Sequence, residues 1–181
     1  LNPISDVSGL SSTELKIRTN KVIKKIFSTI KKFNDLKIIV KLHAIQLEHN
    51  EEIKSLIKEL DNTVPVYIST SIIDTINSAD VVVVVSPENS ATSTMLLESM
   101  ILGKPTMNIF CNEQIYKFNH IQRNAVFTIN DQSDIEKDLE KMLFNKEFQK
   151  DLTRNADNFI KEFMHNPGCA SEDFSKILKS Y

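Results

Sequence analysis

The chain has 181 residues, with 22 Lys or Arg against 24 Asp or Glu, and therefore a net charge of −2. Its length suits one domain with a real core. The balanced charge and 41% apolar residues exclude a disordered tail and a strongly basic nucleic-acid-binding domain. The only glycines are Gly9, Gly103 and Gly168, so glycine-rich phosphate loops of the G-x-G-x-x-G kind are excluded as well.

The first part of the chain predicts helices that alternate with strands. Residues 1–12 are polar and turn-rich and are expected to form a loop. The next helix is expected to begin at residues 11–13, because its apolar residues recur at helical spacing from Leu15 to Phe33. Further along, the pattern predicts strands at 36–42 and 64–68 and helices at 48–60 and 71–78, the last with Ile72, Ile73 and Ile76 turned inward.

The second part opens on five consecutive valines, Val81–Val85. A valine run without alternation favours a strand buried on both faces, as at the centre of a parallel sheet. Gly103 is expected to end the helix that follows. The remaining predicted elements are helices at 93–102, 134–144, 147–164 and 170–178 and strands at 105–110 and 125–129. The alternation predicts one α/β domain over residues 1–181, a Rossmann-like doubly wound parallel sheet flanked by helices.

Several classes of site and location are not expected. Two cysteines are too few for a disulfide framework and fit a reducing cytosol. The four histidines are scattered, so we expect no metal site and no cofactor. The valine run is far shorter than the roughly 20 residues of a membrane span. The expected location is cytoplasmic, with a peripheral position at the inner membrane face as the alternative.

The loop after the valine strand carries the most promising polar residues. In a doubly wound sheet, ligands bind outside the carboxyl ends of the strands. A helix that begins near Thr92, Ser93 and Thr94 presents free backbone N–H groups and hydroxyls to an anion such as a phosphate. Glu98 lies one turn further on and can accept two ribose hydroxyls. The alternative is that the hydroxyls only cap the helix and that Glu98 faces solvent.

Histidines near other strand ends are weaker candidates. His43 ends the predicted strand at 36–42, where it either donates to a phosphate or substrate hydroxyl or packs beneath the loop. His120 and Arg123 either face the same cleft or belong to an exposed loop. No Ser/His/Asp or Cys/His set can be assembled, so the catalytic residues are left unassigned.

Three segments carry a family resemblance: Ala79–Val85, Ser90–Met100 and Leu102–Thr106. They resemble the C-terminal, nucleotide-sugar-binding half of GT-B-fold glycosyltransferases, closest to the UDP-N-acetylglucosamine 2-epimerase branch. The likeness covers nearly the whole chain from about Glu14 onward, including the turn at Asn166–Ser171 and Ile177–Leu178 in the final helix. It implies that the chain binds a nucleotide sugar, with UDP as the expected nucleotide.

The resemblance also implies roles for single residues. Thr92, Ser93 and Thr94 match the positions that hold the diphosphate, Glu98 matches the glutamate that holds the ribose, and Ile72 matches the apolar residue against the base. The epimerases, however, usually have Ser-Gly-Gly in place of Thr92–Thr94. This departure favours a glycosyltransferase of polysaccharide or glycoconjugate synthesis. An epimerase-like enzyme and a non-catalytic α/β subunit or interaction module are the alternatives.

A GT-B enzyme also has an N-terminal domain that binds the acceptor. We expect that domain to be absent from these 181 residues and to reside either on the same chain or on a separate subunit. The first strand of the C-terminal half is likewise expected to lie upstream of Leu1. The fragment alone is therefore expected to be inactive.

Overall fold

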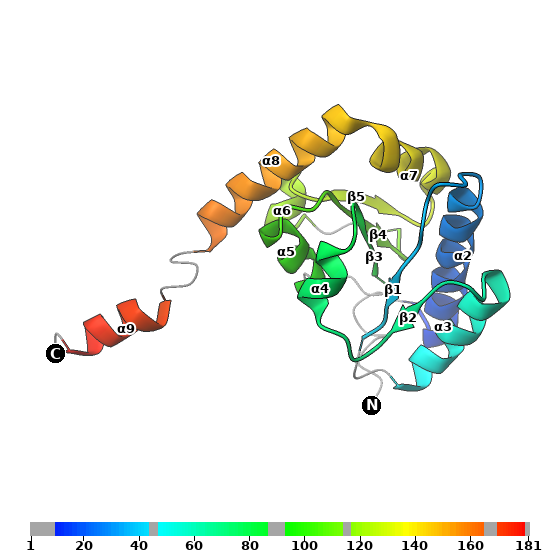
Figure 1. Cartoon of the computed structure of the whole chain (residues 1–181), viewed down its shortest axis with the longest axis horizontal. Coiled ribbons are helices and arrows are strands. Elements are labelled where there is room, and N and C mark those ends of the chain that lie inside the picture. Colours follow the sequence, from blue (N-terminus) through cyan, green and yellow to red (C-terminus); the bar gives the residue numbers. More distant parts are fainter. Residues whose placement is uncertain (1–9, 44–46, 87–92, 114–116, 165–169, 180–181) are drawn as a thin grey trace.

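The computed structural model describes residues 10–43, 47–86, 93–113, 117–164 and 170–179. It is an α/β fold in which helices flank two parallel sheets (Figure 1). This arrangement confirms the predicted fold class and is compatible with a Rossmann-like fold. The helices are α2 (Ser12–Ile30), α3 (Leu47–Leu60), α4 (Ile72–Asn77), α5 (Thr94–Ile101), α6 (Asn119–Gln122), α7 (Ile135–Phe144), α8 (Lys146–Phe163) and α9 (Ala170–Lys179).

The strands divide into two groups rather than forming the one sheet that the sequence predicts. The first sheet pairs β1 (Val40–Lys41) with β2 (Val66–Tyr67). The second has the order β3 (Val82–Ser86), β4 (Thr106–Phe110) and β5 (Phe127–Asn130), and every neighbouring pair is parallel. The first two strands are also much shorter than predicted, because only two residues of each pair with the other.

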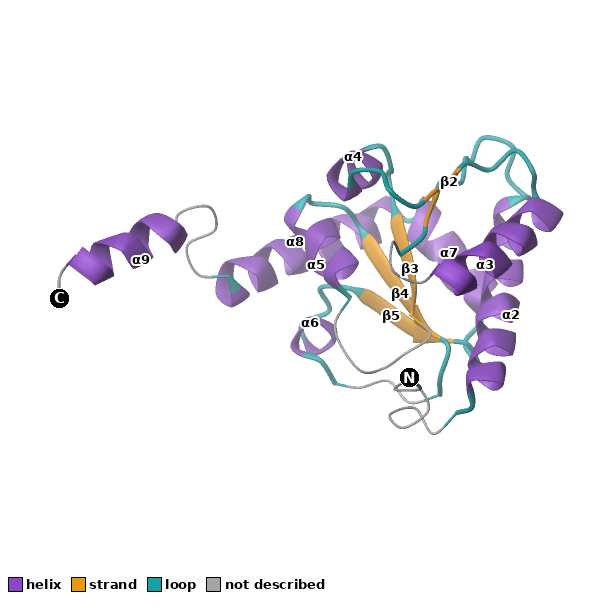
Figure 2. Cartoon of the chain, turned by 90° about the horizontal axis from the view of Figure 1, so that it is seen from below, coloured by secondary structure: helices purple, strands orange, loops and turns teal. Residues whose placement is uncertain are grey.

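Helices cover both faces of the three-stranded sheet (Figure 2). On one face α2 packs on α7, and their apolar residues meet alternate residues of β4, among them Met107 and Ile109. On the other face α5 packs on α8, where Leu96 and Met100 meet Ala156. A third apolar cluster joins α2 to α3 and the two-stranded sheet.

Local signals explain where the predicted helices begin and end. Ser11 Oγ accepts the backbone N–H of Glu14 at 3.2 Å, which caps α2 where the sequence predicts. Gly103 follows α5 with φ of 67°, a left-handed conformation that suits glycine. The expectation for α4 is partly wrong, because Ile76 is buried but Ile73 is 54% exposed.

The valine strand is also less buried than predicted. Val82 is buried, whereas Val83, Val84 and Val85 are only half-buried. The reason is that β3 pairs with β4 along one edge, while its other edge faces a groove. A central strand would have a neighbour on both edges.

Candidate functional site

A groove of about 1310 Å³ separates β1 from β3 and reaches the carboxyl ends of both strands. Ligands of doubly wound folds bind at that end of the sheet. Five of the predicted site residues line the groove: His43, Ile72, Ser93, Thr94 and Glu98. The sixth, Thr92, lies outside the described residues. The structure therefore places the described members of the predicted site along one groove.

The start of α5 presents polar groups to this groove. Ser93 is the residue before the helix, yet its side chain makes no capping hydrogen bond, whereas Ser11 and Ser71 both cap their helices. The first backbone N–H groups of an α-helix have no partner within the helix, and the helix dipole makes this end positive. Ser93 and Thr94 therefore offer hydroxyl and N–H donors to a negatively charged ligand.

Glu98 lies one helical turn beyond Thr94, on the same groove-facing side of α5. Its Oε2 atom is buried and has no hydrogen-bond partner among the residues that the structure describes. A buried carboxylate oxygen without a donor is unfavourable, so it is a natural acceptor for hydroxyl groups of a ligand.

Further polar residues line the groove that sequence reasoning missed. Asn50 is buried, and its Nδ2 donates to the backbone oxygen of His43 at 2.7 Å, which fixes the end of that strand segment. Ser86 Oγ donates to Asn108 Oδ1 at 2.7 Å. Ser86 could have been found from the sequence, because it directly follows the valine strand. Asn50 gave no such signal, since its position depends on how α3 packs.

His120 and Arg123 do not belong to this site. Neither lines the groove. His120 is 2% exposed and its ring stacks on Phe118 with centroids 5.6 Å apart, while Phe159 of α8 packs against it edge-on. Arg123 is exposed and pairs with Glu162 at 2.7 Å. For His120 both readings of the sequence were wrong, because α6 carries it into the core beneath α8 rather than into the cleft or a loop.

His120 makes stability depend on pH. Burial lowers the pKa of its imidazole below the usual 6.5, so the folded state favours the neutral ring. The imidazole therefore binds a proton more readily in the unfolded chain than in the folded one. The free energy of unfolding that is present above pH 6.5 is lost as the pH falls towards the lower pKa of the folded state. We expect His120→Phe, which keeps an aromatic ring, to remove this part of the pH dependence, at most about 1.4 kcal/mol per pH unit. Urea unfolding at pH 7.5 and pH 5.5 measures it; equal pH dependence in both proteins would contradict it.

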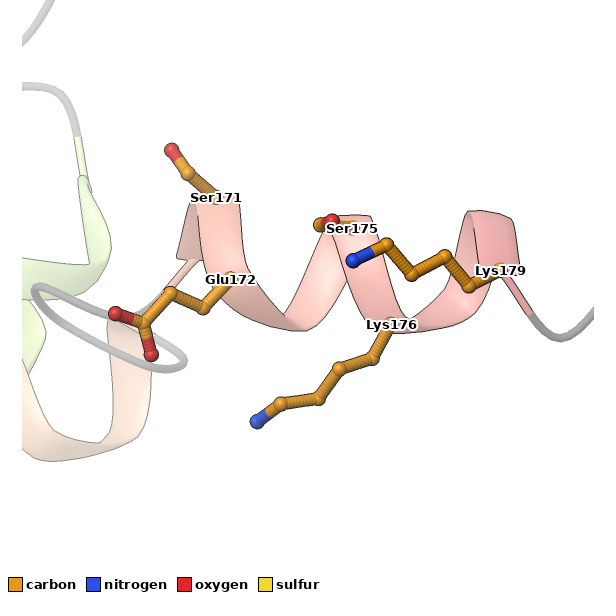
Figure 3. A pocket seen from close by; sticks show the side chains of 5 residues that line it. All are labelled: Ser171, Glu172, Ser175, Lys176 and Lys179. Atoms are coloured by element: carbon orange, nitrogen blue, oxygen red, sulfur yellow. The ribbon is translucent and has the colours of Figure 1, made fainter.

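Neither the buried thiol of Cys111 nor the pocket along α9 forms a competing site. Burial raises the pKa of Cys111 to about 11, so its thiol stays protonated and unreactive. A shallow pocket lies along α9 and is lined by Ser171, Glu172, Ser175, Lys176 and Lys179 (Figure 3). All of its lining residues come from a single helix, so no second element encloses a ligand there.

Comparisons with known proteins identify no relative. No family model, no curated protein and no solved structure matches the chain. Among the described helices, none is long and apolar enough to span a bilayer. Function must therefore be argued from the groove itself.

Proposed function

We propose that the carboxyl end of the groove binds the nucleotide part of a nucleotide sugar, and that the chain is the donor-binding half of a glycosyltransferase. The observation that carries the proposal is the buried Oε2 of Glu98, which has no hydrogen-bond partner among the described residues. It lies one turn from the start of α5 and faces the same groove. A diphosphate needs donors and a ribose needs a hydroxyl acceptor. The two requirements are met on one short helix.

The remaining groove residues fit the other parts of such a ligand. Ile72, half-buried at the start of α4, offers an apolar contact for the face of a base. His43 lines the carboxyl end of the groove and suits a sugar or phosphate oxygen. Transfer of the sugar would need an acceptor and a catalytic group from a second domain, so this chain alone is proposed to bind without turnover.

The proposal predicts that UDP and UDP-N-acetylglucosamine shift the amide resonances of Ser93, Thr94 and Glu98 in an NMR titration. Glu98→Gln should weaken binding by about 1–3 kcal/mol, because the amide cannot accept hydroxyls through both of its terminal atoms. The matched control is Glu59→Gln, which removes the same charge from an exposed position on α3 away from the groove.

Two results would contradict this function. One is a titration in which the shifts avoid the start of α5. The other is an equal change in affinity for Glu98→Gln and Glu59→Gln, because the effect would then not depend on a position in the groove. CDP in parallel titrations distinguishes a uracil-selective site from a general diphosphate site. An assay of the full-length protein with UDP-N-acetylglucosamine and no acceptor separates an epimerase from a transferase.

A further inference from the structure

The middle of the groove lies between two strand edges. On one side it is lined by Ile39, Val40 and Lys41, and on the other by Val83 and Val85. The strands β1 and β3 belong to separate sheets, although both border the same space. At about 1310 Å³ the groove also exceeds the roughly 300–1,000 Å³ of most small-molecule pockets. It is therefore large enough for an occupant besides a nucleotide.

The edge of β1 that faces the groove carries backbone donors and acceptors. The N–H of Val40 donates to the oxygen of Pro65 at 3.0 Å, so Val40 directs its backbone groups towards β2. Successive residues of a strand direct these groups to opposite edges. Ile39 and Lys41 therefore direct theirs into the groove.

The edge of β3 that faces the groove also carries backbone donors and acceptors. The N–H of Val82 donates to the oxygen of Pro105 at 3.0 Å, next to β4. By the same alternation, Val83 and Val85 direct their backbone groups into the groove. Two edges with donors and acceptors thus flank one apolar space, which is the environment of a strand that pairs on both sides.

The position of α2 gives the direction of such a strand. Arg18, in the second turn of α2, contacts Asp131 at 3.4 Å and Glu113 at 3.5 Å. Asp131 directly follows β5 and Glu113 comes shortly after β4, so α2 begins at the carboxyl edge of the sheet. A strand that leads into α2 must end at that edge, and it would therefore run parallel to β3.

Crossover handedness gives its position. Ile23 and Phe27 of α2 form one apolar cluster with Leu56 and Ile57 of α3, so the two helices cover the same face. The helix α3 connects β1 to β2, and parallel crossovers are right-handed in almost all proteins. When two right-handed crossover helices lie on the same face, each places its next strand on the same side of the strand before it. The strand before α2 must then lie on the side of β1 away from β2, which is the groove.

We propose that the groove holds an extended, apolar segment of the polypeptide that precedes Leu1. It would lie parallel to both neighbours and join the two sheets in the order β2, β1, inserted strand, β3, β4, β5. Valine and isoleucine side chains suit it, because helices cover the sheet on both faces. It would bury Val83 and Val85 as the sequence predicts. The proposal concerns the middle of the groove and does not depend on the nucleotide site at its carboxyl end.

The test attaches an additional strand to the chain itself. A short valine- and isoleucine-rich extension is joined to Leu1 through a Gly-Ser linker, and amide hydrogen exchange is followed by NMR. We expect the amides of Ile39, Lys41, Val83 and Val85 to exchange more slowly, on the order of tenfold. Val82, whose N–H already donates to Pro105, is the internal reference. The control extension carries proline at alternate positions, which removes the donors.

A second measurement guards against an extension that misfolds. The valine-rich peptide, with lysines at its ends, is added in trans to the unextended chain, and the same four amides are followed. Equal exchange with the valine and proline extensions, together with no effect of the free peptide, would overturn the proposal. It would also be overturned if the unextended chain already protects these amides in a concentration-dependent dimer, because a second copy would then occupy the groove. Nucleotide titrations of the extended chain test nucleotide binding independently of strand insertion.

Discussion

Replacement of Leu139 by alanine is expected to lower the free energy of unfolding by about 2–5 kcal/mol. Leu139 is fully buried at the centre of α7, in the apolar cluster where α7 and α2 meet β4. The same cluster includes Val22 and Ile26 of α2 and Met107 of β4. Because these elements hold one another, they cannot close the space that the lost side chain leaves. Urea unfolding followed by circular dichroism measures the change.

The matched control for this prediction is Ile101→Ala on α5. Ile101 is 51% exposed, so its truncation removes little buried surface and places a better helix former on the helix. We expect a change of roughly 0.5 kcal/mol or less. A loss at Leu139 that is no larger than the loss at Ile101 would show that the α2–α7–β4 cluster is not the main core of the domain.

Most of the fold could be predicted from local patterns. The ends of α2 and α5 follow from a capping serine and a glycine, both of which act within a few residues. The strand lengths could not be predicted in the same way. Residues 36–42 have the β-branched composition of a strand, but only Val40–Lys41 pair, because strand formation needs a partner on the sheet edge.

For the candidate site, too, residues close together in the sequence could be predicted, whereas contacts between distant segments could not. Ser93 directly precedes α5, and Thr94 and Glu98 lie four residues apart on it, so their spacing alone predicts a common face. His120 was misplaced because its environment is set by Phe159, a residue of α8 that comes much later in the chain. Asn50 was missed for the same reason, since its contact with His43 depends on how α3 returns to the end of the first strand segment.

Arg18 connects the start of α2 to the carboxyl edge of the three-stranded sheet. Its guanidinium contacts Glu14 at 2.9 Å, Asp131 at 3.4 Å and Glu113 at 3.5 Å. The hydrogen bond that Arg18 donates to Glu14, followed by the charge of Asp131, raises the pKa of Arg18 above its usual value. Glu14 and Glu113 are exposed and contribute little, whereas the side chain of Asp131 is only 1% exposed. The contact that matters for stability is therefore the one with Asp131.

Arg18→Met is accordingly expected to cost about 3 kcal/mol, because it leaves the buried carboxylate of Asp131 without its cation. Adding Asp131→Asn to this variant should recover more than 1 kcal/mol of that loss, on the order of the coupling energies of contacting residues. Arg154→Met is the matched control, since Arg154 and its partner Asp151 are both exposed. Urea unfolding of the wild-type protein, Arg18→Met, the double variant and Arg154→Met measures the loss and its recovery. If Arg18→Met and Arg154→Met cost the same, Asp131 does not depend on Arg18, and this ion pair is not what holds the start of α2 at the carboxyl edge.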